Sequence, residues 1–360
     1  MRRPRNRKRS TYFQQMKQVL LFLPLLAFWA CSQKPQSPPS VAPRFITDTL
    51  PYDSDDPAFW LHPTQPDSSL FWGTDKDENG GVYAFNLQGK KLNHLSVFPL
   101  NRPNNCHIVQ GVQLGEMGTK DLLLVSERHS HNLRVYSLPD MTPLDGGGLP
   151  MFEGETGNEY RDLMGVTGYK TNNSQGVYVF IGRKNGPKNG YIWQYWLQAD
   201  SLNQGLKAQL VRKIGRFSGK KEIEALCVDT QNQHLYYSDE QVGIRQYQAH
   251  AQADTNQIAL FGTTQFAEDH EGIALYQPPS GQSMLVVSDQ GAGRLQFFQA
   301  QPPHKHLGYT PYQAKETDGI EIHSGPLSQF PGGLLIAMSD DKTFHLYAMN
   351  DLLQAMVKTP

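Results

Sequence analysis

The chain has 360 residues, and its 33 lysine and arginine residues nearly balance 34 aspartate and glutamate residues, leaving a net charge of −1. This balance gives no electrostatic support for a nucleic-acid partner, so any charge-based function has to be local. Glycine and proline are abundant, with 32 and 24 residues. Such a composition favours short strands joined by turns over long helices.

Residues 1–31 have the features of a lipoprotein-type signal peptide. A basic stretch up to Lys17 is followed by an apolar run over residues 19–30, which is too short to span a bilayer comfortably. Ala30-Cys31 resembles a bacterial lipobox, so we expect lipidation at Cys31; the alternative is a plain secretory signal with an incidental cysteine. The mature protein is then expected to be exported and anchored to a bacterial membrane by its lipid alone, facing the periplasm or the cell surface.

Residues 32–43 follow, rich in serine, glutamine and proline, and this composition predicts a flexible tether. We expect residues 44–360 to form the folded domain. The two cysteines that remain, Cys106 and Cys227, provide no metal framework, and a disulfide between them cannot be inferred from sequence.

A hairpin pattern recurs six times in this domain. Each copy is an apolar run, a polar turn with charged residues and a second run that ends in an aromatic residue, which predicts a β-hairpin. The copies follow one another at roughly 50 residues, a spacing typical of propeller blades. They span residues 70–85, 122–136, 177–195, 235–247, 284–298 and 334–347. The sequence therefore predicts an all-β chain folded as a six-bladed β-propeller.

A second element precedes most hairpins and consists of an acid, a small residue and a short strand. In a propeller blade this is the innermost strand, so its start lies at one mouth of the central channel. The second blade has no acid at this place, and the third blade matches more loosely. The starts are Asp55-Asp56-Pro57-Ala58, Asn105-Cys106, Asp162-Leu163, Glu224-Ala225, Glu271-Gly272 and Asp318-Gly319.

The strand after each inner strand runs antiparallel to it and therefore ends at the same mouth. Its last residues are charged as well. They are Asp75-Lys76, Glu127-Arg128, Arg183, Asp239-Glu240, Asp289 and Asp340-Asp341. We expect both sets of side chains to meet around one opening, where Lys76, Arg128 and Arg183 supply the cations.

A ring of carboxylates at one rim repels itself unless a cation lies within it. Calcium is the expected occupant, because it takes about six to eight oxygen ligands from carboxylates, carbonyl groups and water. The absence of histidine and cysteine at metal-ligand spacing argues against zinc. Alternatively, these acids only cap turns or bind calcium that holds the blades together without chemistry.

The three cations beside this acidic site would orient an anionic substrate. Arginine offers a bidentate fork to phosphate oxygens and lysine a compact charge, although each cation taken alone could be a solvated turn residue. Calcium with such cations favours a substrate that carries several phosphates and is attacked by an activated water. The chain has no G-x-S-x-G nucleophile motif and no P-loop. His107 and His270 are candidates for substrate contact, whereas His129 and His131 are expected to face solvent.

These residues resemble a known family, the β-propeller phytases, which are six-bladed calcium-dependent enzymes that hydrolyse inositol hexakisphosphate (phytate). Residues 55–63 are similar to the opening signature of that family, and the likeness runs from about residue 45 to residue 347. The other matching pieces are Gly73-Thr74-Asp75-Lys76, Ser126-Glu127-Arg128, Ile223-Glu224-Ala225-Leu226, Ser238-Asp239-Glu240, Glu271-Gly272-Ile273, Ser288-Asp289-Gln290-Gly291 and Thr317-Asp318-Gly319-Ile320.

The resemblance implies a 3-phytase, a phosphoric monoester hydrolase whose substrate is calcium-phytate or another inositol phosphate. A calcium-activated water would attack phosphorus while a neighbouring phosphate anchors the substrate in an affinity site. Lys76 and Arg128 would bind phosphate, as would Arg183, which stands where the family usually has lysine. Glu224, Glu240, Glu271, Lys76 and Arg128 would take part in catalysis. The implied calcium ligands are Asp55, Asp56, Glu224, Glu240, Asp269, Glu271 and Asp318.

The sequence departs from the family at the affinity side of the site. Asp77 stands where a second lysine is frequent in the family, and Met164 replaces an aromatic residue. The basic residue that is usual near the second inner strand is missing from residues 104–109. The sequence therefore leaves open whether turnover is slower than in the family and whether the substrate is another phosphorylated molecule. Two other hypotheses are a non-catalytic, calcium-stabilised surface propeller that binds a partner or a glycan, and a propeller lactonase with a metal deep in its channel. Propellers of this kind favour a monomer.

Overall fold

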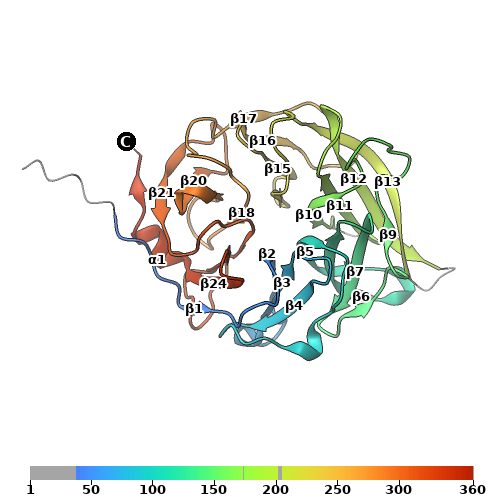
Figure 1. Cartoon of the computed structure of the whole chain (residues 1–360), viewed down its shortest axis with the longest axis horizontal. Coiled ribbons are helices and arrows are strands. Elements are labelled where there is room, and N and C mark those ends of the chain that lie inside the picture. Colours follow the sequence, from blue (N-terminus) through green and yellow to red (C-terminus); the bar gives the residue numbers. More distant parts are fainter. Residues whose placement is uncertain (1–37, 173, 202–204, 360) are drawn as a thin grey trace, which may run out of the picture. The chain divides into compact units, whose positions relative to one another are not determined.

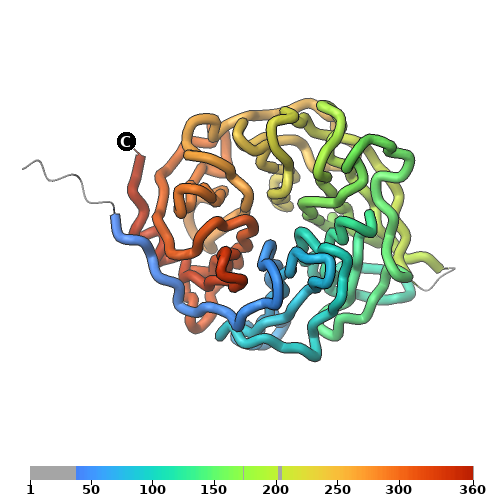
Figure 2. The backbone as a smooth tube through the Cα atoms, in the orientation of Figure 1, coloured from blue at the N-terminus to red at the C-terminus, as the bar shows by residue number. Residues whose placement is uncertain are grey.

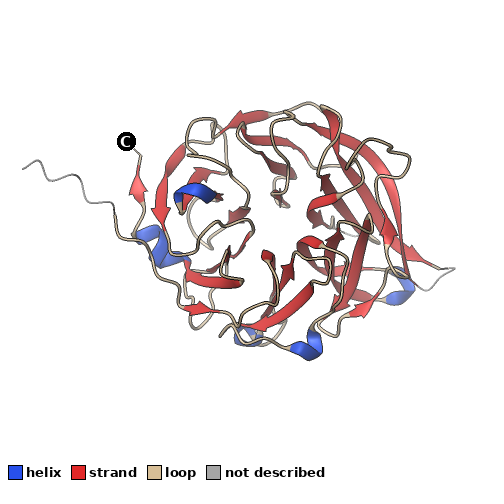
Figure 3. Cartoon of the chain, in the orientation of Figure 1, coloured by secondary structure: helices blue, strands red, loops and turns tan. Residues whose placement is uncertain are grey.

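β-Strands make up nearly all the regular structure of the described residues, as the repeated hairpins predict (Figure 3). A computed structural model describes residues 38–359, except residue 173 and residues 202–204. Within these residues, six antiparallel sheets stand around a common centre (Figure 1). The chain is therefore a six-bladed β-propeller, which confirms the predicted fold class.

Each blade is one sheet, and its first three strands follow one another outward from the central channel. Blade 1 contains β2 (Ser54–Trp60), β3 (Leu70–Asp75) and β4 (Gly81–Asn86). Blade 2 contains β5 (Pro103–Gln113), β6 (Thr119–Glu127), β7 (Asn132–Leu138), β8 (Thr142–Pro143) and β9 (Leu149–Pro150). Blade 3 contains β10 (Leu163–Tyr169), β11 (Val177–Arg183), β12 (Asn189–Asp200) and β13 (Gly205–Arg216).

The other three blades repeat this order. Blade 4 contains β14 (Leu226–Asp229), β15 (His234–Asp239), β16 (Gly243–Gln248) and β17 (Ala259–Phe261). Blade 5 contains β18 (Ile273–Tyr276), β19 (Met284–Asp289), β20 (Arg294–Gln299), β21 (His306–Pro311) and β25 (Val357–Lys358). Blade 6 contains β22 (Ile320–His323), β23 (Leu334–Ser339), β24 (Thr343–Ala348) and β1 (Phe45–Ile46). The described helices are α1 (Met349–Gln354) and short 3-10 helices at Pro66–Ser68, Asn93–Leu95, Gly115–Met117 and Gln290–Ala292.

The N-terminal strand closes the ring by pairing with the last blade. In blade 6, β1 runs antiparallel to β24, so that Phe45 faces Leu346 and the first described residues lie beside the last strands (Figure 2). Val41 forms a bridge with Tyr312, three residues before the predicted domain boundary at residue 44. The predicted signal peptide, Cys31 and residues 32–37 of the tether lie outside the described residues. Among the residues that are described, no helix is long and apolar enough to cross a membrane.

Apolar side chains pack mainly between neighbouring blades. Phe71 of blade 1, for example, meets Phe344 of blade 6 with their ring centroids 6.1 Å apart. Gly73 lies beside the same ring, and a Cβ atom there would approach Phe344 to 2.2 Å, so only glycine fits this contact. Burying a side chain such as phenylalanine contributes about 1.5–3 kcal/mol. Interfaces of this kind hold the inner strands, and with them the charged strand ends, in fixed positions.

Candidate metal and phosphate site

In each blade, the last residue of the second strand and the residue directly after it lie in different environments. The last strand residue turns into its own blade, where Asp239 accepts a hydrogen bond from Arg245 and Asp289 accepts one from Arg294. Because successive side chains of an extended chain alternate in direction, the next residue turns the other way. The pairs are Asp75 and Lys76, Glu127 and Arg128, Arg183 and Lys184, Asp239 and Glu240, Asp289 and Gln290, and Ser339 and Asp340. The prediction that the charged strand ends all face the opening is therefore wrong for the last strand residues.

The inner-strand acids come close to one another because a small residue follows them. A Cβ atom on Gly272 would lie 2.5 Å from the carbonyl oxygen of Asp318, and one on Gly319 would lie 2.2 Å from Oδ1 of Asp56. Larger side chains at these two positions would push the inner strands apart. The acid and small-residue pattern in the sequence thus reflects the close approach of neighbouring blades at the channel mouth.

Lys76 connects acids from two blades. Its Nζ atom lies 2.7 Å from Oδ1 of Asp55 and 2.9 Å from Oδ2 of Asp318. Burial alone would lower the pKa of Lys76, but the charges of Asp55 and Asp318 outweigh burial and raise it, so the ammonium group stays charged. The same ion pair, against the effect of burial, lowers the pKa of Asp318. The structure brings these three predicted site residues together.

Gln290 makes a similar connection between blades 5 and 6. Its side-chain amide donates to Oε2 of Glu271 at 3.1 Å and to Oδ1 of Asp318 at 2.6 Å. Gln290 follows Asp289 and therefore occupies the position in its blade that Lys76 occupies in blade 1. Sequence reasoning assigns no role to this glutamine, although its place directly after a charged strand end is a usable signal.

Three of the predicted metal ligands form a compact acidic group, which we call the carboxylate triad: Glu240, Asp269 and Glu271. One carboxylate oxygen from each lies within 4.8 Å of the others. Both carboxylate oxygens of Glu240 are buried without a hydrogen-bond partner. Burial, with nearby acids, raises the pKa of Glu240 to about 9 and that of Glu271 to about 11. Three carboxylates that converge on one point, with the oxygens of Glu240 buried and unpaired, fit a hard divalent cation that prefers oxygen ligands.

The remaining predicted ligands continue this acidic surface toward blade 1. Burial raises the pKa of Asp56 and of Glu224 to about 7, and it raises the pKa of Asp55 well above its usual value. Asp56 accepts a hydrogen bond from the backbone N–H of Cys106 at 2.9 Å, and Asn104 lies 3.5 Å from Glu224.

Arg128 also lies at the opening, in blade 2. Its Nε atom is 3.6 Å from Oδ2 of Asp162, and this nitrogen is buried without a hydrogen-bond partner. Arg128 is thus charge-paired with Asp162, and its contact with a substrate phosphate stays a prediction. Of the predicted histidines, His107 bonds to the carbonyl oxygen of Gly168 and His270 bonds to Ser238, so their contact with substrate stays a prediction.

Arg183 does not reach the opening. Its side chain is 0% exposed, it pairs with Glu155 at 2.8 Å, and it donates to the carbonyl oxygen of Tyr191 at 3.0 Å. Its guanidinium group also lies over the ring of Phe152. The prediction that Arg183 binds a substrate phosphate is therefore not supported by its position, because Arg183 is the last residue of β11 and turns into blade 3.

We expect the substitution Arg183→Met to destabilise the fold. It would leave carbonyl oxygens of blade 3 without donors and Glu155 without its partner. Since Glu155 is partly exposed, the expected loss is about 2–3 kcal/mol of the free energy of unfolding, measured by denaturant unfolding beside the exposed control Arg216→Met. A variant of unchanged stability that loses activity would instead restore a substrate role for Arg183.

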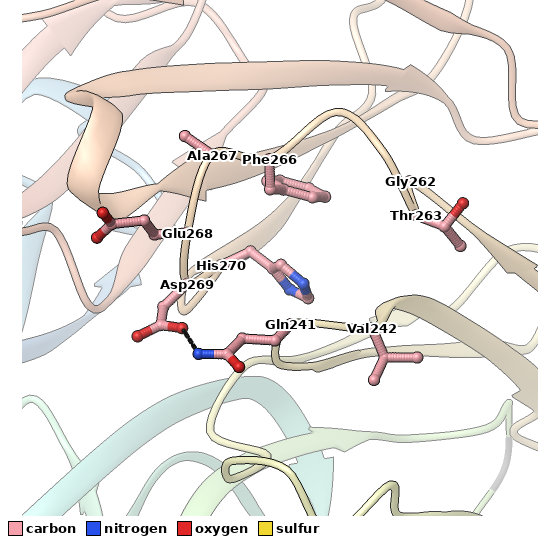
Figure 4. Close-up of a pocket in the computed structure, with 9 residues that line it drawn as sticks. All are labelled: Gln241, Val242, Gly262, Thr263, Phe266, Ala267, Glu268, Asp269 and His270. Carbon is pink, nitrogen blue, oxygen red and sulfur yellow. Dashed lines mark hydrogen bonds between the residues drawn. The ribbon is translucent and has the colours of Figure 1, made fainter.

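A hollow of about 340 Å³ opens directly beside the triad, between blades 4 and 5 (Figure 4). Asp269 lies at its edge and accepts a hydrogen bond from Gln241 at 2.9 Å. Phe266, with its ring 4.3 Å from that of His270, supplies an apolar wall. Asp269 of the triad can therefore be approached from solvent on this side.

Comparison with known proteins places the chain in a family. A phytase family model matches residues 40–356. The 3-phytase of Bacillus subtilis (strain 168) is 23% identical over 310 residues, which are 82% of this chain and 77% of the relative.

Two solved structures resemble the chain in fold alone, at low sequence identity. A luciferin-regenerating enzyme has a TM-score of 0.53 and 13% identity, covering 84% of this chain and 95% of its own. A calcium-binding protein, regucalcin, from Agrobacterium tumefaciens (strain C58) has a TM-score of 0.51 and 12% identity, covering 85% of this chain and 94% of its own. Since the phytase family model spans nearly the whole propeller, the chain belongs to the phytase family.

Proposed function

We propose that this protein is a calcium-dependent phytase that releases inorganic phosphate from phytate at the carboxylate triad. The observation that carries the proposal is the triad itself, in which oxygens of Glu240, Asp269 and Glu271 lie within 4.8 Å of one another. Family membership and the 3-phytase relative support the reaction. We further propose that the chain has the 3-phytase specificity of that relative.

The site residues fall into two groups: carboxylates that would bind calcium and cations that would orient the substrate. The triad, together with Asp55, Asp56, Glu224 and Asp318, would hold several calcium ions. When bound, calcium would neutralise phosphate charge and lower the pKa of water for attack on phosphorus. Lys76 holds Asp55 and Asp318 in place, and Arg128, which lies beside Asp162, would bind a phosphate oxygen. Fixed cations of this kind stabilise the charge that spreads over phosphate oxygens in the transition state.

We further propose that the protein works outside the cytoplasm as a lipid-anchored monomer. The support is the signal-like residues 1–31 with Cys31 in the sequence. Mass spectrometry of the protein from a lipoprotein-processing host would test this, because an acylated N-terminal Cys31 is expected, and replacement by serine should release the protein from the membrane.

Phosphate release from phytate tests the proposed function. Protein that begins after Cys31 should release phosphate with calcium present and should lose nearly all of this activity in chelator. A simple monophosphate ester, run in parallel, should be a much poorer substrate, because it lacks a second phosphate for the orienting cations. A folded, calcium-stabilised protein that releases no phosphate would contradict the proposal and favour the binding propeller.

A further inference from the structure

Both side-chain oxygens of Asp269 have a partner within the chain. Lys221 donates from its Nζ atom to Oδ2 at 2.7 Å, and Gln241 donates to Oδ1 at 2.9 Å (Figure 4). Glu240, by contrast, is buried with both carboxylate oxygens unpaired. Asp269 is therefore a member of the carboxylate triad whose negative charge is already paired with a lysine of the same chain.

The loop between β13 and β14 carries Lys221, and its ion pair crosses from blade 4 to the acid that precedes β18 in blade 5. Two other residues of this loop bind the end of β15 and the turn after it. Ser218 donates from its hydroxyl group to Oδ1 of Asp239 at 2.8 Å, and Lys220 donates to the carbonyl oxygen of Gln241 at 3.2 Å. These bonds fix the loop at points other than the ion pair, so the position of Lys221 beside the triad does not depend on that pair alone.

The charge of Lys221 acts on the whole triad. The hydrogen bond to Asp269, with the charges of Asp269, Glu240 and Glu271, raises the pKa of Lys221. The effect is mutual, because Lys221 opposes the rise that burial causes in the pKa of Glu240. The ammonium group therefore interacts with the same three carboxylates that would hold calcium.

Lys221 is held less firmly than Lys76, the lysine between blades 1 and 6. The Lys76 side chain is 15% exposed and pairs with both Asp55 and Asp318, whereas the Lys221 side chain is 40% exposed and pairs with Asp269. A partly exposed ion pair contributes little to stability, while a buried charge that loses its partners is strongly destabilising. Lys221 can therefore leave its carboxylate for solvent at small cost, and Lys76 cannot.

We propose that Lys221 competes with calcium for Asp269 and thereby sets the calcium affinity of the carboxylate triad. This inference rests on the proposed function, because it concerns the same site. The affinity of an oxygen-ligand site for calcium depends on the charge of its ligands, and Lys221 offsets one of the three negative charges. Like charges beside one carboxylate repel each other, so with calcium bound the ammonium group turns to solvent. Lys221 is thus a residue that tunes metal binding, without contact with the substrate.

Calorimetric titration of calcium into the calcium-free protein tests this inference without turnover. The triad contribution is the part of the isotherm that is lost in Glu240→Gln. We expect Lys221→Met to bind calcium there about fivefold more tightly, the effect of removing one partly exposed ion pair. Lys221→Arg keeps the charge and should bind as the wild type does. The matched control is Lys220→Met, which changes the net charge equally but removes a bond to a carbonyl oxygen, so the affinity should not change.

Chemical labelling gives a second measurement on the unsubstituted protein. The rate at which an amine-reactive reagent acetylates Lys221, followed by mass spectrometry, should be higher with calcium than with chelator, because the amine is released from Asp269. Lys90 is the internal reference. It also pairs with a carboxylate, Asp48 at 3.0 Å, but outside the triad, so its rate should be the same in both conditions.

The outcomes separate this inference from the proposed function. Equal calcium affinity of the wild type and Lys221→Met, an equal gain in Lys220→Met, or a Lys221 labelling rate that calcium leaves unchanged would overturn the inference. Tighter binding by Lys221→Met alone supports it even if the wild type releases no phosphate from phytate, a result that would count against the proposed function only. An isotherm that Glu240→Gln leaves unchanged would overturn both, because calcium would then not bind at the triad.

Discussion

Replacement of Glu240 by glutamine is expected to abolish phosphate release from phytate, by about a thousandfold or more, while the propeller remains folded. Glu240 is buried with both carboxylate oxygens unpaired, and it stands within the triad. Glutamine keeps its shape but removes a charged oxygen ligand, and loss of metal activation costs several kcal/mol of transition-state stabilisation, about 1.4 kcal/mol for each factor of ten. Initial rates with saturating calcium and phytate would measure this effect.

The same substitution is expected to raise the melting temperature in chelator. Without calcium, the buried carboxylate of Glu240 is destabilised by burial and by nearby acids, which raise its pKa to about 9; the neutral amide does not ionise. The matched control is Glu78→Gln, since Glu78 lies on the β3–β4 turn with its side chain 73% exposed. A folded Glu240→Gln variant with full activity would remove the triad from the mechanism.

Calcium removal is expected to make the stability of the fold strongly dependent on pH. The pKa values of Glu224, Glu240 and Glu271 are raised by burial to about 7, 9 and 11 respectively. In the unfolded chain these groups titrate near 4.5. The folded protein therefore holds protons that the unfolded chain has already released, and stability falls as pH rises above about 4.5 and up through the folded pKa values. The pKa of Asp269 is lowered in the folded protein, so the stability that this group contributes is lost only when the pH falls. It therefore does not reverse the trend at neutral pH.

Thermal melting between pH 5 and pH 9, with chelator and with excess calcium, would measure this dependence. In chelator, the melting temperature should fall steadily across the range. In calcium, the ions compensate the ionised carboxylates and bind the folded state alone, so the curve should lie higher and be much flatter. Parallel curves with and without calcium would mean that these carboxylates do not form the calcium site.

The propeller itself could be predicted because its repeat is local. Each hairpin carries its own alternation and turn, and the spacing of the copies fixes the number of blades. The inner-strand acids were also predictable, since an acid before a small residue marks the place where two blades approach closely, as at Gly319 beside Asp56. Both signals lie within a few neighbouring residues.

The error at Arg183 has a physical cause. The sequence pattern predicts that a charged residue at the end of a strand faces the opening, but direction alternates along the chain, and only the residue after the strand points there. The last position needs an internal partner, which Arg245 supplies for Asp239 and Glu155 supplies for Arg183. Those partners are distant in sequence from the strand ends or lie on other elements, so the sequence alone could not distinguish the two positions.

The most direct test of the proposed calcium site at the triad is a crystal structure of the protein grown with calcium, with the ion identified by its anomalous signal. We expect an ion bound by oxygens of Glu240, Asp269 and Glu271 at about 2.3–2.6 Å. An active, calcium-dependent protein whose ions all lie elsewhere, with these three carboxylates bound to none, would contradict the account.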